Sequence, residues 1–148
     1  MNSLLTPVEL ACIAIAVAAV LTNFVMVAMR WSDLPEKVPR HYGLTGRPDH
    51  WSPKGVIWIY PGISLVMMVA MAGSLMAGAD KLDSEALRAQ FALNLRPMSI
   101  MAAYLSVLML ALTMRTVAVA EKRAAGLGRL FIPAILASVA IIVVLFRK

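Results

Sequence analysis

Cysteine and histidine are both scarce in this sequence. One cysteine, Cys12, and two histidines, His41 and His50, occur in 148 residues. A lone cysteine cannot form an intrachain disulfide, and the lack of a cysteine cluster excludes the usual zinc and iron–sulfur motifs. Cys12 lies inside an apolar run, so we interpret it as a small buried hydrophobic residue. The sequence therefore predicts no cofactor.

Charge is also scarce, and it is unevenly distributed. Charged residues make up 15% of the chain and hydrophobic residues 61%, and the charges are gathered into blocks between long apolar runs. This composition is typical of a protein that crosses a membrane several times. No apolar run carries a charge near its centre. A pump or a proton-coupled transporter is therefore disfavoured, because ion pathways need ionisable groups within the membrane.

The chain nevertheless has a net charge of +6. Its basic residues flank the apolar runs, where such residues set membrane topology and meet anionic lipid headgroups. The sequence shows no basic surface interleaved with aromatic residues, which is the pattern expected of a nucleic-acid-binding protein. We therefore predict contact with the lipid bilayer and no nucleic-acid partner.

The long uncharged runs predict the fold class, an all-α membrane protein with four transmembrane helices. The first run follows Thr6-Pro7-Val8-Glu9, a capping box with proline at the first helical position. Its about 20 uncharged residues form roughly 30 Å of helix, which crosses a bilayer. No lysine or arginine precedes Arg30, so we expect a retained span and not a cleaved signal peptide. The predicted spans of this single membrane domain, 1–148, are 8–30, 56–79, 97–118 and 129–146.

A polar segment, 81–96, separates the second and third predicted spans. Apolar residues recur in it at every fourth position, and Asp80 or Ser84 can cap a helix. Two interpretations stay open: an amphipathic helix at the membrane interface, or a helical extension that enters the third span, with Pro97 at the joint. We expect the third helix to end at Gly126, because glycine favours helix C-termini.

The longest polar connection, loop 32–55, joins the first two spans. It holds both histidines and four of the eight prolines, and three tryptophans and two tyrosines lie in or beside it. Loops of this length are usually functional or disordered, and the prolines, glycines and aromatic residues argue against disorder. Tryptophan and tyrosine favour the headgroup level of a membrane. We therefore expect a structured, Pro/Gly-rich loop that lies at the interface.

The order of residues in this loop predicts a hairpin-like path. The Leu-Pro and Val-Pro pairs restrict the residues before each proline to extended conformations. The segment 43–46 begins and ends with glycine, so it can form a turn that uses positive φ. The returning chain then brings Asp49 or His50 back towards His41.

The same loop carries a motif that resembles a known family. Leu34-Pro35 and Val38-Pro39 precede His41-Tyr42-Gly43, and then follow Gly46, Pro48-Asp49, Trp51 and Lys54. Directly after a first span, this pattern resembles the bacterial domain of unknown function 1648, the N-terminal module of SdpI-type immunity proteins, over roughly residues 15–65. The resemblance implies a multi-pass protein of the bacterial inner (plasma) membrane. It also implies six signature positions, namely Pro35, Pro39, His41, Gly46, Asp49 and Lys54.

The resemblance and the residues leave two classes of function open. SdpI-type proteins carry further membrane helices and protect their producer from a secreted toxin, so the first hypothesis is a binding role through loop 32–55. The partner would be a peptide toxin or another membrane protein, and homo-oligomerisation is a further alternative. The second hypothesis is a small membrane enzyme or metal-binding protein that uses His41, Asp49 and Lys54, with His50 as an additional metal ligand. We favour the first hypothesis, since the loop lacks a full ligand set.

A structural role is the simplest interpretation of the same polar residues. His41 then hydrogen-bonds the loop backbone, and Asp49 caps a turn or pairs with Arg47 or Lys54.

Membrane orientation is a separate open question. With four spans, nine basic residues lie on the side of the loop and five on the other side, which favours a cytoplasmic loop. Resemblance to the SdpI-type family implies an external one.

Overall fold

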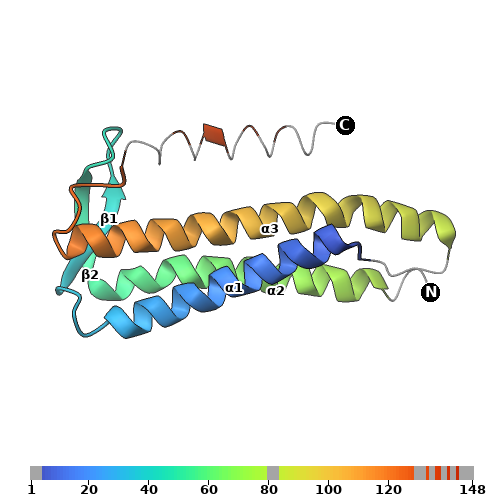
Figure 1. Ribbon diagram of the computed structural model, residues 1–148, viewed down its shortest axis with the longest axis horizontal. Coiled ribbons are helices and arrows are strands. Elements are labelled where there is room, and N and C mark those ends of the chain that lie inside the picture. The colour runs from blue at the N-terminus through green and yellow to red at the C-terminus, as the bar shows by residue number, and fades with distance from the viewer. Residues whose placement is uncertain are drawn as a thin grey trace.

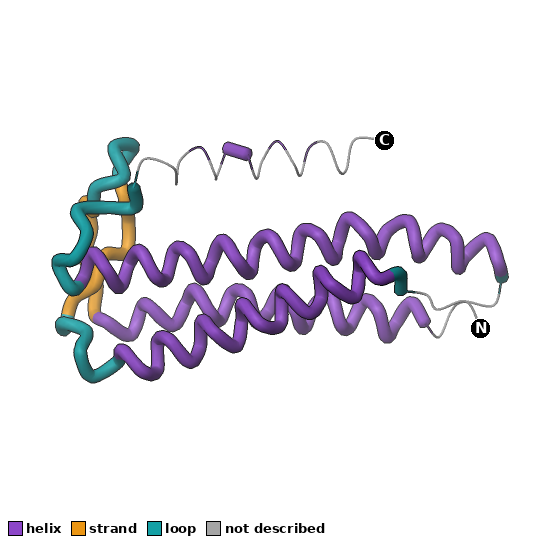
Figure 2. The backbone as a smooth tube through the Cα atoms, viewed as in Figure 1, coloured by secondary structure: helices purple, strands orange, loops and turns teal. Residues whose placement is uncertain are grey.

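The computed structural model describes residues 5–79 and 84–128, together with Pro133, Leu136, Ala137, Ala140 and Val143. Three helices lie side by side, and a β-hairpin crosses one end of them (Figure 1). The strands and most of the described loops gather at that same end (Figure 2). In chain order the elements are α1 (Pro7–Arg30), β1 (Lys37–Tyr42), β2 (Pro48–Pro53), the 3₁₀ helix η1 (Lys54–Trp58), α2 (Ile59–Ala79) and α3 (Glu85–Ala120).

Three stretches of the described residues are long and apolar enough to cross a membrane. They are α1, the stretch Lys54–Ser74 that joins η1 to most of α2, and α3. The chain therefore has the helices of a membrane protein, as the composition predicts. The fourth predicted span, 129–146, lies for the most part outside the described residues, so the count of four helices stays a prediction.

The capping box at the start of α1 is confirmed. The Thr6 amide donates a hydrogen bond to Glu9 Oε2 at 2.8 Å, the Thr6 hydroxyl contacts the same carboxylate, and Pro7 is the first helical residue. These contacts satisfy donors that an isolated helix end leaves free.

Helices α1 and α3 run in the same direction along the bundle, towards the hairpin, and α2 runs away from it (Figure 1).

Helix α3 decides between the two interpretations of segment 81–96. It is one helix of 36 residues that begins after Ser84, whose hydroxyl accepts a hydrogen bond from the Leu87 amide at 3.3 Å, and residues 81–83 lie outside the described part. Residues 85–96 are therefore a helical extension of the third span. The expected joint at Pro97 is wrong, because Pro97 lies inside the continuous helix. A proline removes one backbone hydrogen bond, and packing against neighbouring helices compensates for that loss in a membrane span.

The predicted end of α3 at Gly126 is also wrong. The helix ends at Ala120 with a Schellman motif, in which the Lys122 amide donates to Val119 O at 3.0 Å and the Arg123 amide to Ala118 O at 2.7 Å. Lys122 adopts the left-handed conformation, with φ of 59°, at the position where glycine is most common. The loop after Lys122 can therefore turn back onto the hairpin.

The described chain is mostly helical, as expected, and loop 32–55 adds a two-stranded sheet to the helices. Strands β1 and β2 pair in antiparallel fashion, with Val38 opposite Ser52 and Tyr42 opposite Pro48. Within the turn, the Gly43 amide donates to Arg47 O at 2.9 Å and the Gly46 amide to Gly43 O at 2.8 Å. Gly46 has φ of +73°, which explains the need for glycine there. The hairpin-like path and its turn thus form where the sequence places them.

A hydrophobic cluster joins the hairpin to the helices. Val38 on β1 is fully buried against residues from α1, η1 and α3, and the partly buried Trp31 and Trp58 pack against the same cluster. Apolar burial of this kind holds the hairpin in one position on the bundle. The buried members are Val27, Leu34, Val38, Ile57, Val117 and Ala120.

Candidate functional site

The candidate site is the hairpin 37–53 with Lys54 and the loop 121–128, which meet at one end of the bundle. Its most distinctive contact joins the two strands: His41 Nδ1 lies 2.7 Å from Asp49 Oδ1. The imidazole side chain is 70% exposed and the carboxylate 51%. The returning chain therefore brings Asp49 to His41, as the hairpin-like path predicts, and leaves both groups open to solvent.

Two irregularities in the strand register lie next to the pair of His41 and Asp49. The register shifts between Pro39 and His41 and again between His41 and Tyr42, so Arg40 on β1 and Asp49 on β2 have no opposite residue. Such bulges redirect side chains and often lie next to functional sites. Among the described residues, neither Arg47 nor Lys54 forms an ion pair with Asp49, so the simple structural pairing of Asp49 with those cations is wrong.

His50 does not complete a metal site with this pair. It lies opposite His41 in the register and is exposed. Within residues 5–79 and 84–128 and the five positions beyond, no three histidine, cysteine, aspartate or glutamate side chains are grouped closely enough to hold a metal ion. Zinc in proteins usually needs at least three protein ligands. The described geometry of His41, Asp49 and His50 therefore offers one hydrogen-bonded pair and not a coordination sphere.

Lys54 is directed to the end of α1 instead of to His41 and Asp49. Its ammonium donates a hydrogen bond to the Trp31 carbonyl at 3.1 Å and lies 4.7 Å from the centre of the Trp31 ring. A cation is favourable there, since unpaired carbonyls give a helix C-terminus a partial negative charge. The Trp31 ring in turn contacts Trp58 at 5.9 Å between centroids. Lys54 thus connects η1 to α1.

Pro35, Pro39 and Gly46 shape the hairpin. Pro39 is fully buried, whereas Pro35 is exposed in the connection before β1. Gly46 is buried and its carbonyl accepts a hydrogen bond from the Leu127 amide at 2.9 Å. Of the six signature positions, the structure therefore brings only His41 and Asp49 together, and Lys54 contacts a different element.

Sequence reasoning missed a contact between the hairpin and α3. The Tyr42 hydroxyl donates a hydrogen bond to Thr116 Oγ1 at 3.1 Å, and Thr116 is fully buried. Burial raises the pKa of Tyr42 to about 12, and the Thr116 hydroxyl opposes this rise only in part, since it can donate a hydrogen bond to the ionised phenolate. The two residues are 74 positions apart, so no local pattern could have paired them.

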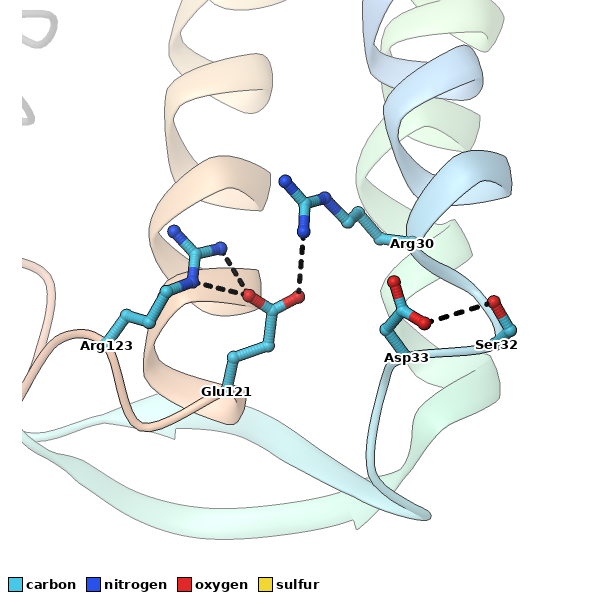
Figure 3. A network of polar contacts seen from close by, with 5 residues as sticks. All are labelled: Arg30, Ser32, Asp33, Glu121 and Arg123. Atoms are coloured by element: carbon cyan, nitrogen blue, oxygen red, sulfur yellow. Dashed lines mark hydrogen bonds and ion pairs between the residues drawn. The ribbon is translucent and has the colours of Figure 1, made fainter.

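A second missed contact is the charge network at the ends of α1 and α3 (Figure 3). Glu121 Oε1 lies 3.8 Å from Arg30 NH1, and Glu121 Oε2 accepts a hydrogen bond from Arg123 Nε at 2.6 Å and also contacts Arg123 NH2. Beside this network, the Ser32 hydroxyl contacts Asp33 at 3.4 Å. Glu121 is the least exposed member of the network and holds α1 and α3 together at the hairpin end. The only sequence signal is that the acid Glu121 is followed by two cations, Lys122 and Arg123.

Comparison with known families agrees with the motif of the loop. Residues 11–65 match the family model described as Domain of unknown function (DUF1648). The match extends from α1 through the hairpin and η1 into α2, and it contains all six signature positions. No curated protein and no solved structure matches the chain. The resemblance to this family is therefore confirmed over the part of the chain that carries the candidate site.

Proposed function

We propose that this DUF1648-containing chain is a membrane-embedded recognition protein that binds a peptide partner through the hairpin 37–53. The observation that carries the proposal is the exposed, hydrogen-bonded pair of His41 and Asp49, 2.7 Å apart, on a hairpin that is otherwise fixed to the bundle. SdpI-like immunity, in which the partner is a secreted peptide toxin, is the form of recognition that the family resemblance supports. The bacterial inner membrane is its proposed location.

Three polar contacts support a preorganised binding surface. Tyr42 is tied to Thr116, Gly46 to Leu127, and Lys54 to Trp31. A surface that is rigid before binding loses less conformational entropy when the partner binds. The hairpin can therefore present His41 and Asp49 in a constant geometry.

The composition of the exposed surface suits a peptide. Leu44, at the turn, is 96% exposed and Trp51 on β2 is 44% exposed. Aromatic and aliphatic side chains beside a charged pair can take up a peptide's apolar side chains and its polar backbone at once. An acidic group and an imidazole also allow the hairpin to meet a basic side chain or a peptide carbonyl.

Recognition is favoured over the enzyme hypothesis by the position of Lys54. An acid–base site made of His41, Asp49 and Lys54 needs all three groups near one substrate atom. The Lys54 ammonium instead contacts the Trp31 carbonyl and ring. Only His41 and Asp49 are in contact, and both are open to solvent.

Protection from a toxin tests the proposal directly. A toxin-sensitive bacterial strain that expresses the full chain is challenged with the secreted peptide toxin of an SdpI-bearing producer, and survival is compared across variants. We expect protection by the native chain, loss of protection with His41→Ala or Asp49→Ala, and full protection with Glu36→Gln. Glu36 is an exposed acid at the same end of the bundle, so its variant controls for charge alone. Equal protection by all variants would refute the role of His41 and Asp49.

Membrane orientation gives a second test of the immunity hypothesis. Recognition of a secreted toxin needs the hairpin outside the cell. Thr45 is exposed in the turn, and Cys12 is the sole native cysteine. In a Cys12→Ala background, Thr45→Cys should therefore react with an impermeant thiol reagent in intact cells. Complete resistance to the reagent would place the hairpin in the cytoplasm, as the basic-residue count favours, and would exclude direct toxin binding.

A further inference from the structure

We propose that a hollow beside β2, separate from the contact between His41 and Asp49, binds the headgroup of an anionic phospholipid. The hollow has a volume of about 430 Å³ and is lined by Pro48, Trp51, Val119 and residues 122–125. It therefore lies between the hairpin and the loop that follows α3. Its lining includes neither His41 nor Asp49, and it shares only Pro48 and Trp51 with the hairpin 37–53 that is proposed above to bind a peptide.

The position of the hollow matches the headgroup level of a membrane. Val119 belongs to the last turn of α3, which is one of the three helices apolar enough to cross a bilayer. The hollow thus opens where the apolar span ends. Trp51 is 44% exposed beside it, and tryptophan prefers this depth because one edge of the ring can be wet and the rest apolar.

Cationic groups surround the hollow without an equal number of acids. Lys122 is exposed, and in the described part of the chain its ammonium forms no hydrogen bond or ion pair. Arg123 lines the hollow and uses Nε and one amino group for Glu121. Glu121 pairs with both Arg30 and Arg123, so the positive charge of Lys122 is not balanced by a neighbouring acid.

The backbone of Lys122 supports a role for its side chain. Lys122 holds the left-handed position of the Schellman motif, with φ of 59°. Glycine suits this position best, because a Cβ makes the conformation unfavourable. Unfavourable backbone conformations cluster at functional sites, where the surrounding structure enforces them. The turn therefore fixes the backbone of Lys122 beside the hollow that its side chain lines.

The remaining lining residues point to a lipid and not to a free anion. Pro48, Val119 and the alanines at 124 and 125 give the hollow an apolar lining beside the basic Lys122 and Arg123. An anionic phospholipid can place glycerol and the first acyl carbons on such a lining while its phosphate meets Lys122 and Arg123. Inorganic phosphate would contact only Lys122 and Arg123 and would leave the apolar lining uncovered.

Native mass spectrometry of the full chain in detergent tests this site, with phosphatidylglycerol and phosphatidylcholine as the added lipids. We expect phosphatidylglycerol to bind more tightly, and its apparent affinity to fall roughly 20-fold in the Lys122→Gln, Arg123→Gln double variant, since each basic residue near an anionic headgroup contributes about fivefold. The control double variant Lys37→Gln, Arg40→Gln removes two exposed charges from β1, outside the hollow, and should keep the native affinity. An equal loss in both double variants, or equal binding of the two lipids, would overturn the proposal.

Two further measurements test whether a loss of binding comes from a disturbed fold, and whether the bound anion is a lipid or a free phosphate. Arg123→Gln also removes a contact with Glu121, so Lys122→Gly is measured alone, because glycine fits the left-handed position and the fold is retained. We expect about a fivefold loss of phosphatidylglycerol binding for this variant, and native affinity would contradict the site. Millimolar inorganic phosphate should leave lipid binding unchanged. Full displacement of the lipid by phosphate would assign the hollow to a free anion.

Discussion

The carbonyl oxygen of Gly46 accepts a hydrogen bond from the amide of Leu127 at 2.9 Å. This bond ties the turn of the hairpin to the loop after α3. The neighbouring Gly126 passes so close that a Cβ on it would collide with the same carbonyl oxygen. Two glycines from distant parts of the chain thus meet backbone to backbone, because any side chain between them would separate the loop from the hairpin.

The first prediction concerns this close approach. Gly126→Ala should destabilise the protein by about 2 kcal/mol, because the new methyl group must push the loop away from Gly46. Gly62→Ala is the matched control, since a Cβ there meets nothing within 4 Å and alanine is the better helix former. Thermal unfolding in detergent, followed by tryptophan fluorescence, should show a lower midpoint for Gly126→Ala and no decrease for Gly62→Ala. Equal midpoints would contradict the contact.

The second prediction uses the left-handed backbone of Lys122. Lys122→Gly and Lys122→Ala remove the same charge, but only glycine relieves the steric cost of a Cβ at φ of 59°. We expect the glycine variant to be more stable than the alanine variant by about 1 kcal/mol. Chemical denaturation of both variants in the same detergent measures the difference. Identical stabilities would mean that the turn relaxes out of the left-handed conformation.

The third prediction concerns the alkaline limit of stability. The pKa of Tyr42 is raised by burial to about 12, above the value of about 10 for tyrosine in an unfolded chain. The neutral phenol therefore contributes stability that is fully present below about pH 10 and is lost as the pH rises towards 12. Absorbance at 295 nm should show one tyrosine that ionises late in the native protein, and Tyr42→Phe should abolish this late step. A late step that persists in Tyr42→Phe would assign it to another tyrosine.

The same substitution has a separate effect at neutral pH. Tyr42→Phe removes the hydrogen bond to Thr116, which is fully buried, so the variant should be about 1 kcal/mol less stable. Thr116→Val removes the same bond from the other side. In a double-mutant cycle the two changes should be less than additive, and strict additivity would show that the bond does not contribute to stability.

The fourth prediction tests the contact between Lys54 and Trp31. Lys54→Met keeps the apolar stem but removes the ammonium that binds the Trp31 carbonyl and lies over its ring. We expect a loss of about 1–2 kcal/mol and a shift of tryptophan emission, because Trp31 loses its cation. Lys37→Met changes an exposed lysine on β1 and should alter neither quantity. If both variants behave alike, Lys54 acts only as a surface charge.

Local signals in the sequence were sufficient for several elements. Thr6, Pro7 and Glu9 predict the start of α1, because capping depends on residues a few positions apart. Ser84 acts as the cap of α3 for the same reason. The uncharged runs predict the helices that can cross a membrane, and the placement of proline and glycine predicts the turn of the hairpin. All of these depend on neighbouring residues or on composition, which a single sequence contains in full.

Other features were decided by the tertiary structure. Pro97 predicts a joint by local rules, but packing along the bundle keeps α3 continuous, and a Schellman motif ends that helix before Gly126. Lys54 contacts Trp31 and lies apart from the hydrogen-bonded His41 and Asp49. Each outcome depends on which surfaces meet in three dimensions, since packing can outweigh a local preference of about 1 kcal/mol.

From the sequence alone come the apolar helices, the hairpin turn and the family motif of loop 32–55. Only the tertiary structure separates that motif into parts with different roles. His41 and Asp49 form an exposed pair, whereas Gly46 and Lys54 hold the hairpin to the loop after α3 and to α1. The physical reason is that contacts such as Tyr42 with Thr116 or Gly46 with Leu127 join residues more than 70 positions apart. No local propensity encodes such pairs, which form only when the whole bundle packs.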